Sequence, residues 1–477
     1  MDTPSEPRAD AEAAADADEL RAAMTTRLRE QGTIRAAAVA AAFRDTPRHL
    51  FLPGVRLYQA YADSVVPTKF DAHGKSISAA SQPTIVALML EQLDVRRGQN
   101  VLEVGAGTGY NAALLGRLVG GHGRVVTVDV DRDLVEGAAA HLRAAGAGNV
   151  EAVLADGALG HPAAAPYDRI SVTVGAGDIP PGWIEQLAPR GRLVVPLRLR
   201  GDVTLSLALD RGASGLLHSA SAQPCTFMPL RGIADDADHV IDLTADGSVS
   251  VHLHHEHERE HAADPDALGR ALDHPAGELA TGVRLAEGDS FAPLDLYLTC
   301  ALPGGLCRLT ALPSADPGLF GGEMAAVSGG SLACVTVFPA QEAADRGREP
   351  DLGQGGVERP LELELDPELG PEPGVAGNAG GSGGSGSSDG LGWQGAPGGA
   401  PAPSRVRGWE VGVSAFGPQG AKLAEVVAGH IRDWDRHARG TQPRFTVAQG
   451  AARADLTGYF VVDKRFSRIA VNWIGAR

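Results

Sequence analysis

Three glycines at alternate positions follow a short apolar segment, and they are the residues best suited to holding a ligand. Val101–Val104 has the composition of a buried strand, and Gly105, Gly107 and Gly109 come directly after it. A helical spacing of apolar residues then begins. A strand that turns through glycines into a helix brings backbone amides close to a ligand and points the helix N-terminus at a negative group. A tight turn that binds nothing has the same local pattern, so the context must decide between the two.

Acidic residues stand at the strand ends where such a unit needs them. Glu103 lies within the first strand, and Asp129 follows a second strand expected at 124–128. An acid at the end of that second strand accepts hydrogen bonds from ribose hydroxyls. Asp156 and Gly157 follow a third strand. Because the carboxyl ends of parallel strands meet at one edge of a sheet, we expect these residues and the three glycines to form one site.

The alternation of strands and helical segments predicts an α/β fold with a parallel sheet and right-handed crossovers. This Rossmann-like core is expected from about 98 to 232. Its strands are expected at 101–104, 124–128, 150–154, 167–174, 191–196 and 203–209.

The spacing of the glycines, together with the acid in the strand, resembles motif I of S-adenosylmethionine (SAM) methyltransferases. That resemblance implies SAM as the cofactor, with the three glycines near its methionine portion and Glu103 supporting the turn. It further implies that Asp129 holds the ribose, that Asp156 accepts from the adenine amino group, and that Gly157 permits a close approach. No metal is implied.

Several segments together resemble protein-L-isoaspartate O-methyltransferases, over roughly residues 20–232. Jointly these segments are specific, although none is specific by itself. They are the Pro-Arg-x-x-Phe segment at 47–51, Ser-Gln-Pro at 81–83, the motifs at 156–157 and 165–170, and Phe-Met-Pro-Leu at 227–230.

The resemblance also implies which residues meet the substrate. A carboxylate is already ionised at neutral pH, so the reaction needs no general base and depends on alignment. The hydroxyl of Ser81 is expected to donate to the substrate carboxylate, with Thr173 as a weaker candidate. The alternative for Ser81 is a plain helix N-cap. An Ile-Ser-Ala sequence ends nearby, but by spacing the family's serine corresponds to Ser81 and not to Ser78.

The second half of the chain resembles the FxLD-system methyltransferases, which are associated with lanthipeptides and other ribosomal peptide natural products. The segments Leu294–Tyr297 and 409–477 carry this resemblance. It implies methylation of an aspartate side chain in such a peptide, leading through a succinimide (aspartimide) to isoaspartate. The alternative is repair of damaged proteins by methylation of isoaspartate. The partner is in both cases a peptide or protein that bears aspartate or isoaspartate, and the oligomeric state is left open.

The amino-acid composition excludes some classes of binding partner and indicates a cellular location. The 477 residues carry a formal net charge of −17, which argues against nucleic acid and against an anionic membrane surface. The four cysteines are too few and too scattered for a disulfide framework or zinc cluster, which favours a cytoplasmic location. The run from His252 to residue 261 has five histidines and could bind metal, but its charged neighbours favour a solvated face.

Two other functional classes stay open. A DNA or RNA amino-methyltransferase needs an Asn/Asp-Pro-Pro-aromatic motif after the fourth strand, and the segment 174–182 does not have one. A peptide-binding protein without activity would be expected to lose Asp129 or the glycines, and all are present.

Domain organisation and local elements follow from the same patterns. We expect disorder at 1–19, a catalytic domain at 20–232, and an α+β accessory domain at 233–477 that is interrupted by a flexible Gly-rich insertion at 340–408. We also expect a polar, turn-rich segment at 61–80. Further expected elements are a hairpin with arms at 294–300 and 306–311, a strand at 409–416, a helix along 423–434 ending by Gly440, and a last strand at 469–474.

Overall fold

Five parallel strands form the part of the sheet that carries the glycine turn. They are β3 (Asn100–Val104), β4 (Arg124–Asp129), β5 (Val150–Leu154), β6 (Tyr167–Val172) and β7 (Leu187–Arg198). Their order from the outer edge inward is β5-β4-β3-β6-β7, and every neighbouring pair is parallel. The predicted parallel α/β sheet is therefore confirmed.

The structure is a computed structural model, and one compact unit holds all the residues it describes. Across these residues, no helix is long and apolar enough to cross a membrane. The expected insertion at 340–408 lies outside the described residues apart from Gly408, as do residues 255–261 of the histidine run. The described segments are 6–72, 74–232, 239–254, 263–286, 288–312, 323–339 and 408–473.

Helices cover the parallel strands because the apolar side chains of these helices are buried against the sheet. Helix α5 buries the stripe predicted for it, since residues 112, 114, 115, 118 and 119 are all buried. The helices and short 3-10 turns of this region are α4 (Pro83–Leu93), α5 (Tyr110–Val119), α6 (Arg132–Ala144), η2 (Gly157–Leu159), η3 (Pro162–Ala164) and α7 (Pro181–Gln186).

The N-terminal segment corrects one expectation. Helix α1 spans Glu6–Glu30, so most of the segment 1–19 that we expected to be disordered is helical. The alanine-rich composition that suggested disorder also has high helix propensity, and Ala17, Met24 and Leu28 are buried. The next helix ends at Asp45, two residues before Pro47, because the residue before a proline disfavours the helical conformation. The elements that follow α1 are α2 (Ala37–Asp45), η1 (Arg48–Phe51) and α3 (Leu57–Ala60).

A β-hairpin occupies the segment 61–80, which the sequence suggested to be only polar and turn-rich. Its strands are β1 (Val66–Phe70) and β2 (Ser76–Ala80), and they pair antiparallel. No residue of β1 is buried, so the strand lacks the alternation of apolar and polar residues that marks a half-buried strand.

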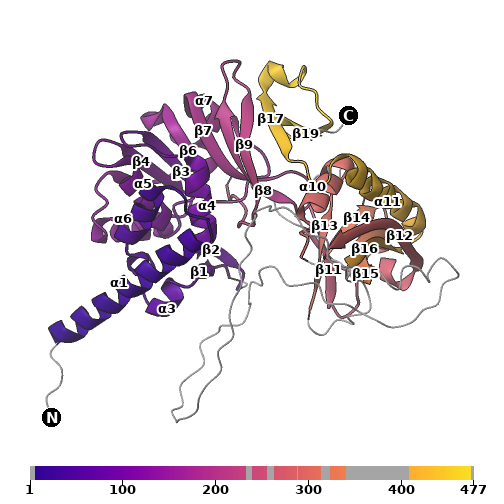
Figure 1. Ribbon diagram of the computed structural model, residues 1–477, viewed down its shortest axis with the longest axis horizontal. Coiled ribbons are helices and arrows are strands. Elements are labelled where there is room, and N and C mark those ends of the chain that lie inside the picture. The colour runs from indigo at the N-terminus through magenta and orange to yellow at the C-terminus, as the bar shows by residue number, and fades with distance from the viewer. Residues whose placement is uncertain are drawn as a thin grey trace, which may run out of the picture. The chain divides into compact units, whose positions relative to one another are not determined.

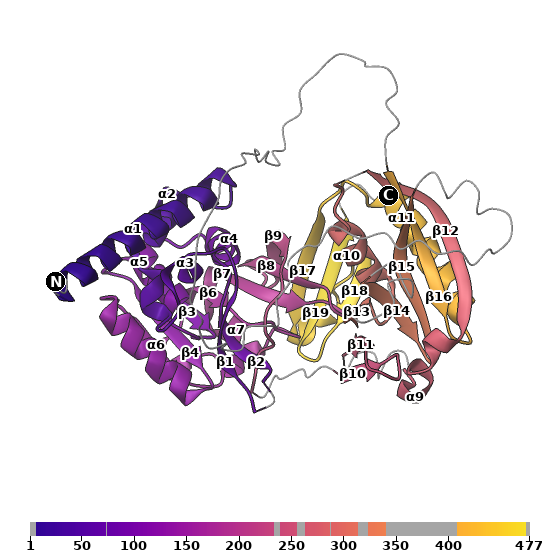
Figure 2. The ribbon, with the colours of Figure 1, turned by 90° about the horizontal axis from the view of Figure 1, so that it is seen from below.

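The sheet continues antiparallel beyond β7, and its last strands come from the C-terminus of the chain. Strand β17 pairs with β9, so the end of the chain adds to the sheet of the first half (Figure 1). Figure 2 shows β17, β18 and β19 side by side next to α10. Strand β9 was not expected from the sequence. The bounds are β8 (Thr204–Arg211), β9 (Leu217–Pro224), β17 (Pro443–Gln449), η5 (Gly450–Arg453), β18 (Phe460–Asp463) and β19 (Ser467–Trp473).

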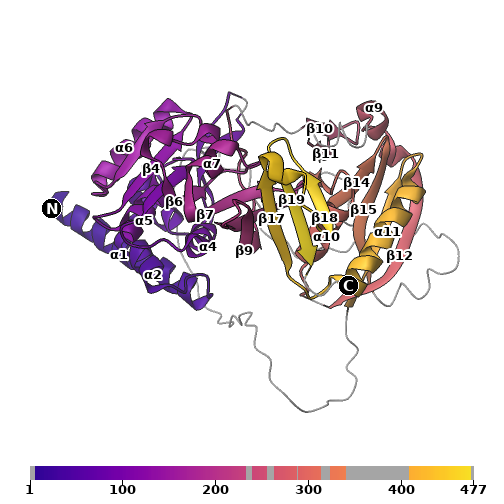
Figure 3. The same ribbon diagram turned by 90° about the horizontal axis from the view of Figure 1, so that it is seen from above.

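A second, seven-stranded antiparallel sheet has the order β10-β11-β13-β14-β15-β16-β12. Helix α11 packs on β12, β15 and β16 (Figure 3). Its strands are β10 (His239–Asp242), β11 (Val249–Leu253), β12 (Pro275–Ala286), β13 (Cys307–Ala311), β14 (Met324–Ser328), β15 (Ser331–Pro339) and β16 (Gly408–Phe416). The helices are α9 (Pro265–Leu268), η4 (Ala271–Asp273), α10 (Ala292–Ala301) and α11 (Gly420–His437).

The hairpin expected at 294–311 is wrong in its first arm. Residues 294–300 lie in helix α10, and only the second arm is a strand, β13. The alternation of leucines suggested a strand, but Leu294, Leu296 and Tyr297 are all buried along with the residues after them. A short helix buried on every side has no periodicity that distinguishes it from a strand.

One hydrophobic core connects the two halves of the chain. Leu193 and Leu205 belong to the same buried cluster as Val411, Ile431 and Phe445. The ten-stranded sheet likewise contains strands from both sides of residue 232. The domain boundary at 232/233 therefore stays a prediction.

Candidate functional site

The glycine turn after β3 has the backbone conformation that its sequence predicts. Gly105, Gly107 and Gly109 have φ values of 101°, 48° and 87°, in the region that favours glycine. The amides of Gly105 and Ala106 donate to the carbonyl of Val128 at 2.9 and 3.1 Å. The turn is thereby fixed against the end of β4, and helix α5 begins directly after it.

The turn is tightly packed on one side and open at its centre. A Cβ on Gly105 would lie 2.7 Å from Oγ1 of Thr173, too close for any side chain. A Cβ on Gly107 would meet only Oγ of Ser78, at 4.0 Å. The backbone at Gly107 therefore leaves space for a ligand.

The Asp129 carboxylate lies beside this open backbone. Its Oδ2 accepts from the Gly107 amide at 3.1 Å, and its Oδ1 accepts from the Asp131 amide at 3.2 Å. The Asp129 side chain is only 10% exposed, whereas the apolar Val130 next to it is 41% exposed. A fixed carboxylate next to an exposed apolar side chain fits a ribose followed by a flat apolar base.

Glu103 is the buried acid beneath the turn. Its Oε1 accepts from Nδ2 of Asn111 at 2.7 Å, while its Oε2 is buried with no hydrogen-bond partner among the described residues. Burial raises the pKa of Glu103 to about 7; contacts with Thr127 and Asn111 oppose the rise, and the charge of Asp129 adds to it. An orphaned buried carboxyl oxygen at a glycine turn fits a cofactor that carries a cationic amino group.

Asp156 and Gly157 stand at the end of β5, as predicted. Oδ1 of Asp156 accepts from the Ala158 amide at 2.9 Å and caps η2. A Cβ on Gly157 would lie 2.6 Å from Cγ1 of Val104 in β3. Because Gly157 has no side chain, its backbone can lie close to β3, the strand that precedes the glycine turn. Contact of Asp156 with an adenine stays a prediction.

Ser81 is not the N-cap of helix α4. The helix begins at Pro83, its N-cap residue is Gln82, and the carboxylate of Asp63 accepts from the backbone amide and hydroxyl of Thr84. The alternative that Ser81 is a plain N-cap is wrong. Pro83 occupies the first helical position, so the N-cap position falls on Gln82. Its part in binding a substrate stays a prediction.

A buried arginine that the sequence reasoning missed holds Ser81. Arg48 donates from Nη2 to the Ser81 carbonyl at 2.9 Å and from Nε to the Ala60 carbonyl at 2.8 Å. Its guanidinium lies over the Tyr110 ring, 4.8 Å from the centroid, and burial lowers its pKa. The Pro-Arg-x-x-Phe segment was the available signal, but it did not indicate what the arginine contacts.

The Thr173 hydroxyl is engaged with the glycine turn. It donates to the Gly105 carbonyl at 2.7 Å, and the Val104 carbonyl lies at 3.0 Å. A hydroxyl has one proton, so this bond competes with any bond to a substrate. Contact of Thr173 with a substrate stays a prediction.

Two cations that the sequence reasoning also missed bind the acids after β4. Lys69 of the hairpin lies 2.8 Å from Oδ1 of Asp133 and 3.3 Å from Oδ2 of Asp131. Arg231 pairs with Asp131 at 2.5 Å and lies 4.0 Å from Oδ1 of Asp129. The hydrogen bond from Lys69 lowers the pKa of Asp133. These pairs fix the β1–β2 hairpin and the segment after β9 near the expected ribose site.

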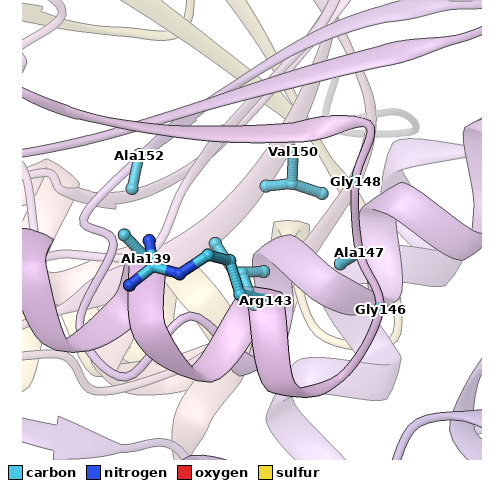
Figure 4. A pocket seen from close by; sticks show the side chains of 8 residues that line it. Ala139, Arg143, Gly146, Ala147, Gly148, Val150 and Ala152 are labelled. Atoms are coloured by element: carbon cyan, nitrogen blue, oxygen red, sulfur yellow. The ribbon is translucent and has the colours of Figure 1, made fainter.

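A separate hollow of about 390 Å³ lies between the end of α6 and the start of β5 (Figure 4). It is lined by Arg143 and by small or apolar residues that include Ala139, Gly146 and Val150. It therefore opens at the amino end of β5, whereas the glycine turn lies at the carboxyl ends of the strands. None of the predicted site residues lines it.

In the histidine run, the described residues bind neighbouring side chains. Nε2 of His254 lies 3.0 Å from Oδ1 of Asp202, and Nε2 of His252 lies 3.1 Å from the hydroxyl of Thr310. Within the described segments, no group of three or more His, Cys, Asp or Glu residues is arranged to hold a metal ion.

The fold is that of the SAM-dependent methyltransferases, with the glycine turn and Asp129 at the carboxyl edge of the parallel sheet. Residues 19–234 match the model of the protein-L-isoaspartate(D-aspartate) O-methyltransferase family. A relative from Archaeoglobus fulgidus, protein-L-isoaspartate O-methyltransferase 2, is 42% identical over 46% of this chain and 95% of its own length. This chain belongs to the protein-L-isoaspartate O-methyltransferase family, and it is a SAM-dependent carboxyl O-methyltransferase.

Other similarities cover a comparable share of the chain. The Methanopyrus kandleri protein-L-isoaspartate O-methyltransferase is 41% identical over 44% of this chain and 91% of its own length. A solved protein-L-isoaspartate O-methyltransferase structure is 34% identical, with a TM-score of 0.42, and covers 45% of this chain and 67% of its own. Each of these matches covers less than half of the chain, and the family model ends at residue 234.

Proposed function

We propose that this enzyme methylates the α-carboxylate of isoaspartate in peptides or proteins. The observation that carries this proposal is the 42% identity to a protein-L-isoaspartate O-methyltransferase along 95% of that relative. The family model matches residues 19–234, a range that includes the glycine turn, Asp129 and the Ser81 segment. It favours the repair alternative over our expectation of a peptide-tailoring enzyme.

The residues of the site fit this reaction without a general base. When bound, SAM supplies a methyl group on a positively charged sulfur, which a carboxylate oxygen can attack directly. The glycine turn and Glu103 would hold the methionine portion, and Asp129 would hold the ribose. Asp156 would accept from the adenine amino group. Ser81 would donate its hydroxyl proton to the substrate carboxylate and orient one oxygen, while Arg48 fixes the Ser81 backbone.

The ester has a chemical consequence for the substrate. Methoxide is a far better leaving group than oxide, so the neighbouring backbone amide nitrogen attacks the ester carbon and closes a succinimide. Water then opens the ring to aspartate or isoaspartate. The enzyme is needed only for the ester, and the ring closure is a property of the peptide.

A second candidate is methylation of an aspartate side chain in a ribosomal peptide natural product, as the FxLD resemblance implies. The observation that favours it is the second half of the chain. Its strands β17–β19 join the sheet of the catalytic half, although the family model ends at residue 234. Repair of proteins at large requires no such addition, whereas an added domain offers a surface that suits the binding of one defined peptide.

The test compares two peptides that differ only in the linkage of one residue. The full-length enzyme is incubated with SAM and with an aspartyl or an isoaspartyl peptide, and mass spectrometry follows the products. The proposal predicts a gain of one methyl group, or a net loss of water, on the isoaspartyl peptide alone. Modification of the aspartyl peptide alone would contradict it and support the tailoring reaction.

A further inference from the structure

The loop after β6, residues 173–180, borders the glycine turn. The Thr173 amide donates to the Val104 carbonyl at 2.9 Å, and its hydroxyl donates to Gly105. Gly175 exchanges two backbone hydrogen bonds of 2.7 Å with residues 228 and 230. The first half of the chain thus fixes the start of this loop. Because ligands of open α/β sheets bind at the carboxyl ends of strands, the loop forms one wall of the methyl-transfer site.

The far end of the same loop is held by the C-terminal strands. Oδ2 of Asp178 accepts from the Phe466 amide, and its Oδ1 accepts from the hydroxyl of Ser467, both at 2.5 Å. Nε2 of Gln449 donates to the Ile179 carbonyl, also at 2.5 Å. These donors lie 270 or more residues away along the chain, at the end of β17 and the start of β19.

The contacts are suited to setting the position of the loop. Hydrogen bonds to a carboxylate are shorter and stronger than those between neutral groups. Ser467 is fully buried, so its hydroxyl has a fixed direction. Strand β17 pairs with β9, which anchors these donors to the sheet on which the loop itself is built. Loops that carry function depend on such a rigid scaffold for their position.

We propose that the end of β17 and the start of β19 are a positioning part of the methyl-transfer site, acting through Gln449, Ser467 and Asp178 on the wall formed by residues 173–180. The expected effect of this positioning on peptide binding rests on the proposed function. Substrate binding then depends on the C-terminal half of the chain, although no C-terminal residue needs to touch SAM.

The test removes the two side-chain donors in the full-length chain, as the double variant Gln449→Ala/Ser467→Ala. The control is Asp463→Asn in the β18–β19 hairpin, which weakens the surface pair of Asp463 with Arg468. Arg468 follows Ser467 in β19, and successive strand residues point to opposite faces of a sheet. The Asp463–Arg468 pair therefore lies on the face opposite to the Ser467 hydroxyl. Three quantities are measured: hydrogen exchange of residues 173–180, the Kd of SAM by calorimetry, and kcat and KM for the isoaspartyl peptide.

The proposal predicts exchange of the loop faster by about tenfold and a KM for the peptide raised by about tenfold, with the Kd of SAM within about twofold of the parent. Asp463→Asn should match the parent in all three. Unchanged exchange in the double variant would overturn the proposal. Weakened SAM binding together with faster exchange throughout the chain would also overturn it, because this result indicates that Gln449 and Ser467 have a merely structural role. If the parent enzyme modifies neither peptide, the proposed function fails, and exchange of the loop decides the positioning proposal.

Discussion

Glu103 combines burial with an unpartnered oxygen, so its ionisation is linked to the stability of the fold. Its pKa is raised from 4.5 to about 7 by burial. An acid with a raised pKa stabilises the folded state fully below its unfolded value, and this contribution is lost as the pH rises through the folded value. The shift corresponds to roughly 3 kcal/mol at most.

We therefore predict that Glu103→Gln flattens the dependence of stability on pH. Between pH 5 and pH 8 the parent should lose up to about 3 kcal/mol of unfolding free energy that the variant retains. Gln keeps an oxygen that can accept from Asn111, so the variant can preserve that hydrogen bond. Urea unfolding of the SAM-free protein at both pH values measures this. An equal difference between the two proteins at pH 5 and pH 8 would contradict it.

A second prediction separates the two serines near the site. Ser81→Ala should lower kcat/KM for the peptide by about tenfold to a hundredfold, because a hydrogen bond to a charged group is worth about 1.5–3 kcal/mol. The Kd of SAM should be unchanged. Ser78→Ala is the matched control, since Ser78 accepts from Thr68 in the hairpin and lies near Gly107. Loss of activity in Ser78→Ala with normal activity in Ser81→Ala would reverse the assignment.

At the scale of residues, the sequence predicted groups that lie at strand ends. Gly105, Asp129 and Asp156 could be placed because parallel strands bring their carboxyl ends together. Arg48, Lys69 and the Asp178–Ser467 contact could not, because their partners are separated along the chain by tens to hundreds of residues and depend on packing.

At the scale of elements, ion pairs attach the β1–β2 hairpin to the region near the site. Lys69 ties it to Asp131 and Asp133 at the start of α6. These three side chains are partly or largely exposed. Ion pairs between exposed side chains contribute little to global stability and are screened by salt.

We predict that Lys69→Ala increases hydrogen exchange of residues 66–80 while lowering the free energy of unfolding by less than about 1 kcal/mol. High salt should produce part of the same effect in the parent and none in the variant. Hydrogen exchange followed by mass spectrometry, at low and high salt, makes the comparison. Equal protection of the hairpin in both proteins would mean that Lys69 does not hold it.

Helix α10 and strand β1 show why some elements were missed. The residues of α10 are buried on all sides, and those of β1 are exposed on both faces. Neither segment has the one-sided apolar pattern from which periodicity is read. By contrast, α11 buries one stripe, and the sequence predicted this helix close to its observed bounds.

At the scale of the whole molecule, the two halves share a sheet and a hydrophobic core. Strand β9 pairs with β17, and Leu217 of β9 lies in the same buried cluster as Phe445 and Val447. Composition and motif spacing could not predict this, because they identified the halves separately. The pairing of strands so distant in sequence follows only from the folded structure.

We predict that a fragment ending at residue 232 aggregates or fails to fold, although it contains every predicted site residue. The truncation exposes the edge of β9 and the apolar surface that β17 and β19 cover. Size-exclusion chromatography and SAM calorimetry of the fragment and the full chain test this. A monomeric fragment that binds SAM and methylates peptide with the KM of the full chain would show that the halves are independent.

The central claim is that carboxyl methyl transfer takes place at the glycine turn and depends on Asp129. Its most direct test is the initial rate at which label from methyl-labelled SAM enters an isoaspartyl peptide as a base-labile ester. The rate is compared between the parent and Asp129→Ala, with thermal unfolding as the check on folding. We predict ester formation by the parent and a loss of at least about a hundredfold in kcat/KM for a folded variant. No base-labile label from a SAM-bound parent, or an equal rate in the variant, would contradict the claim.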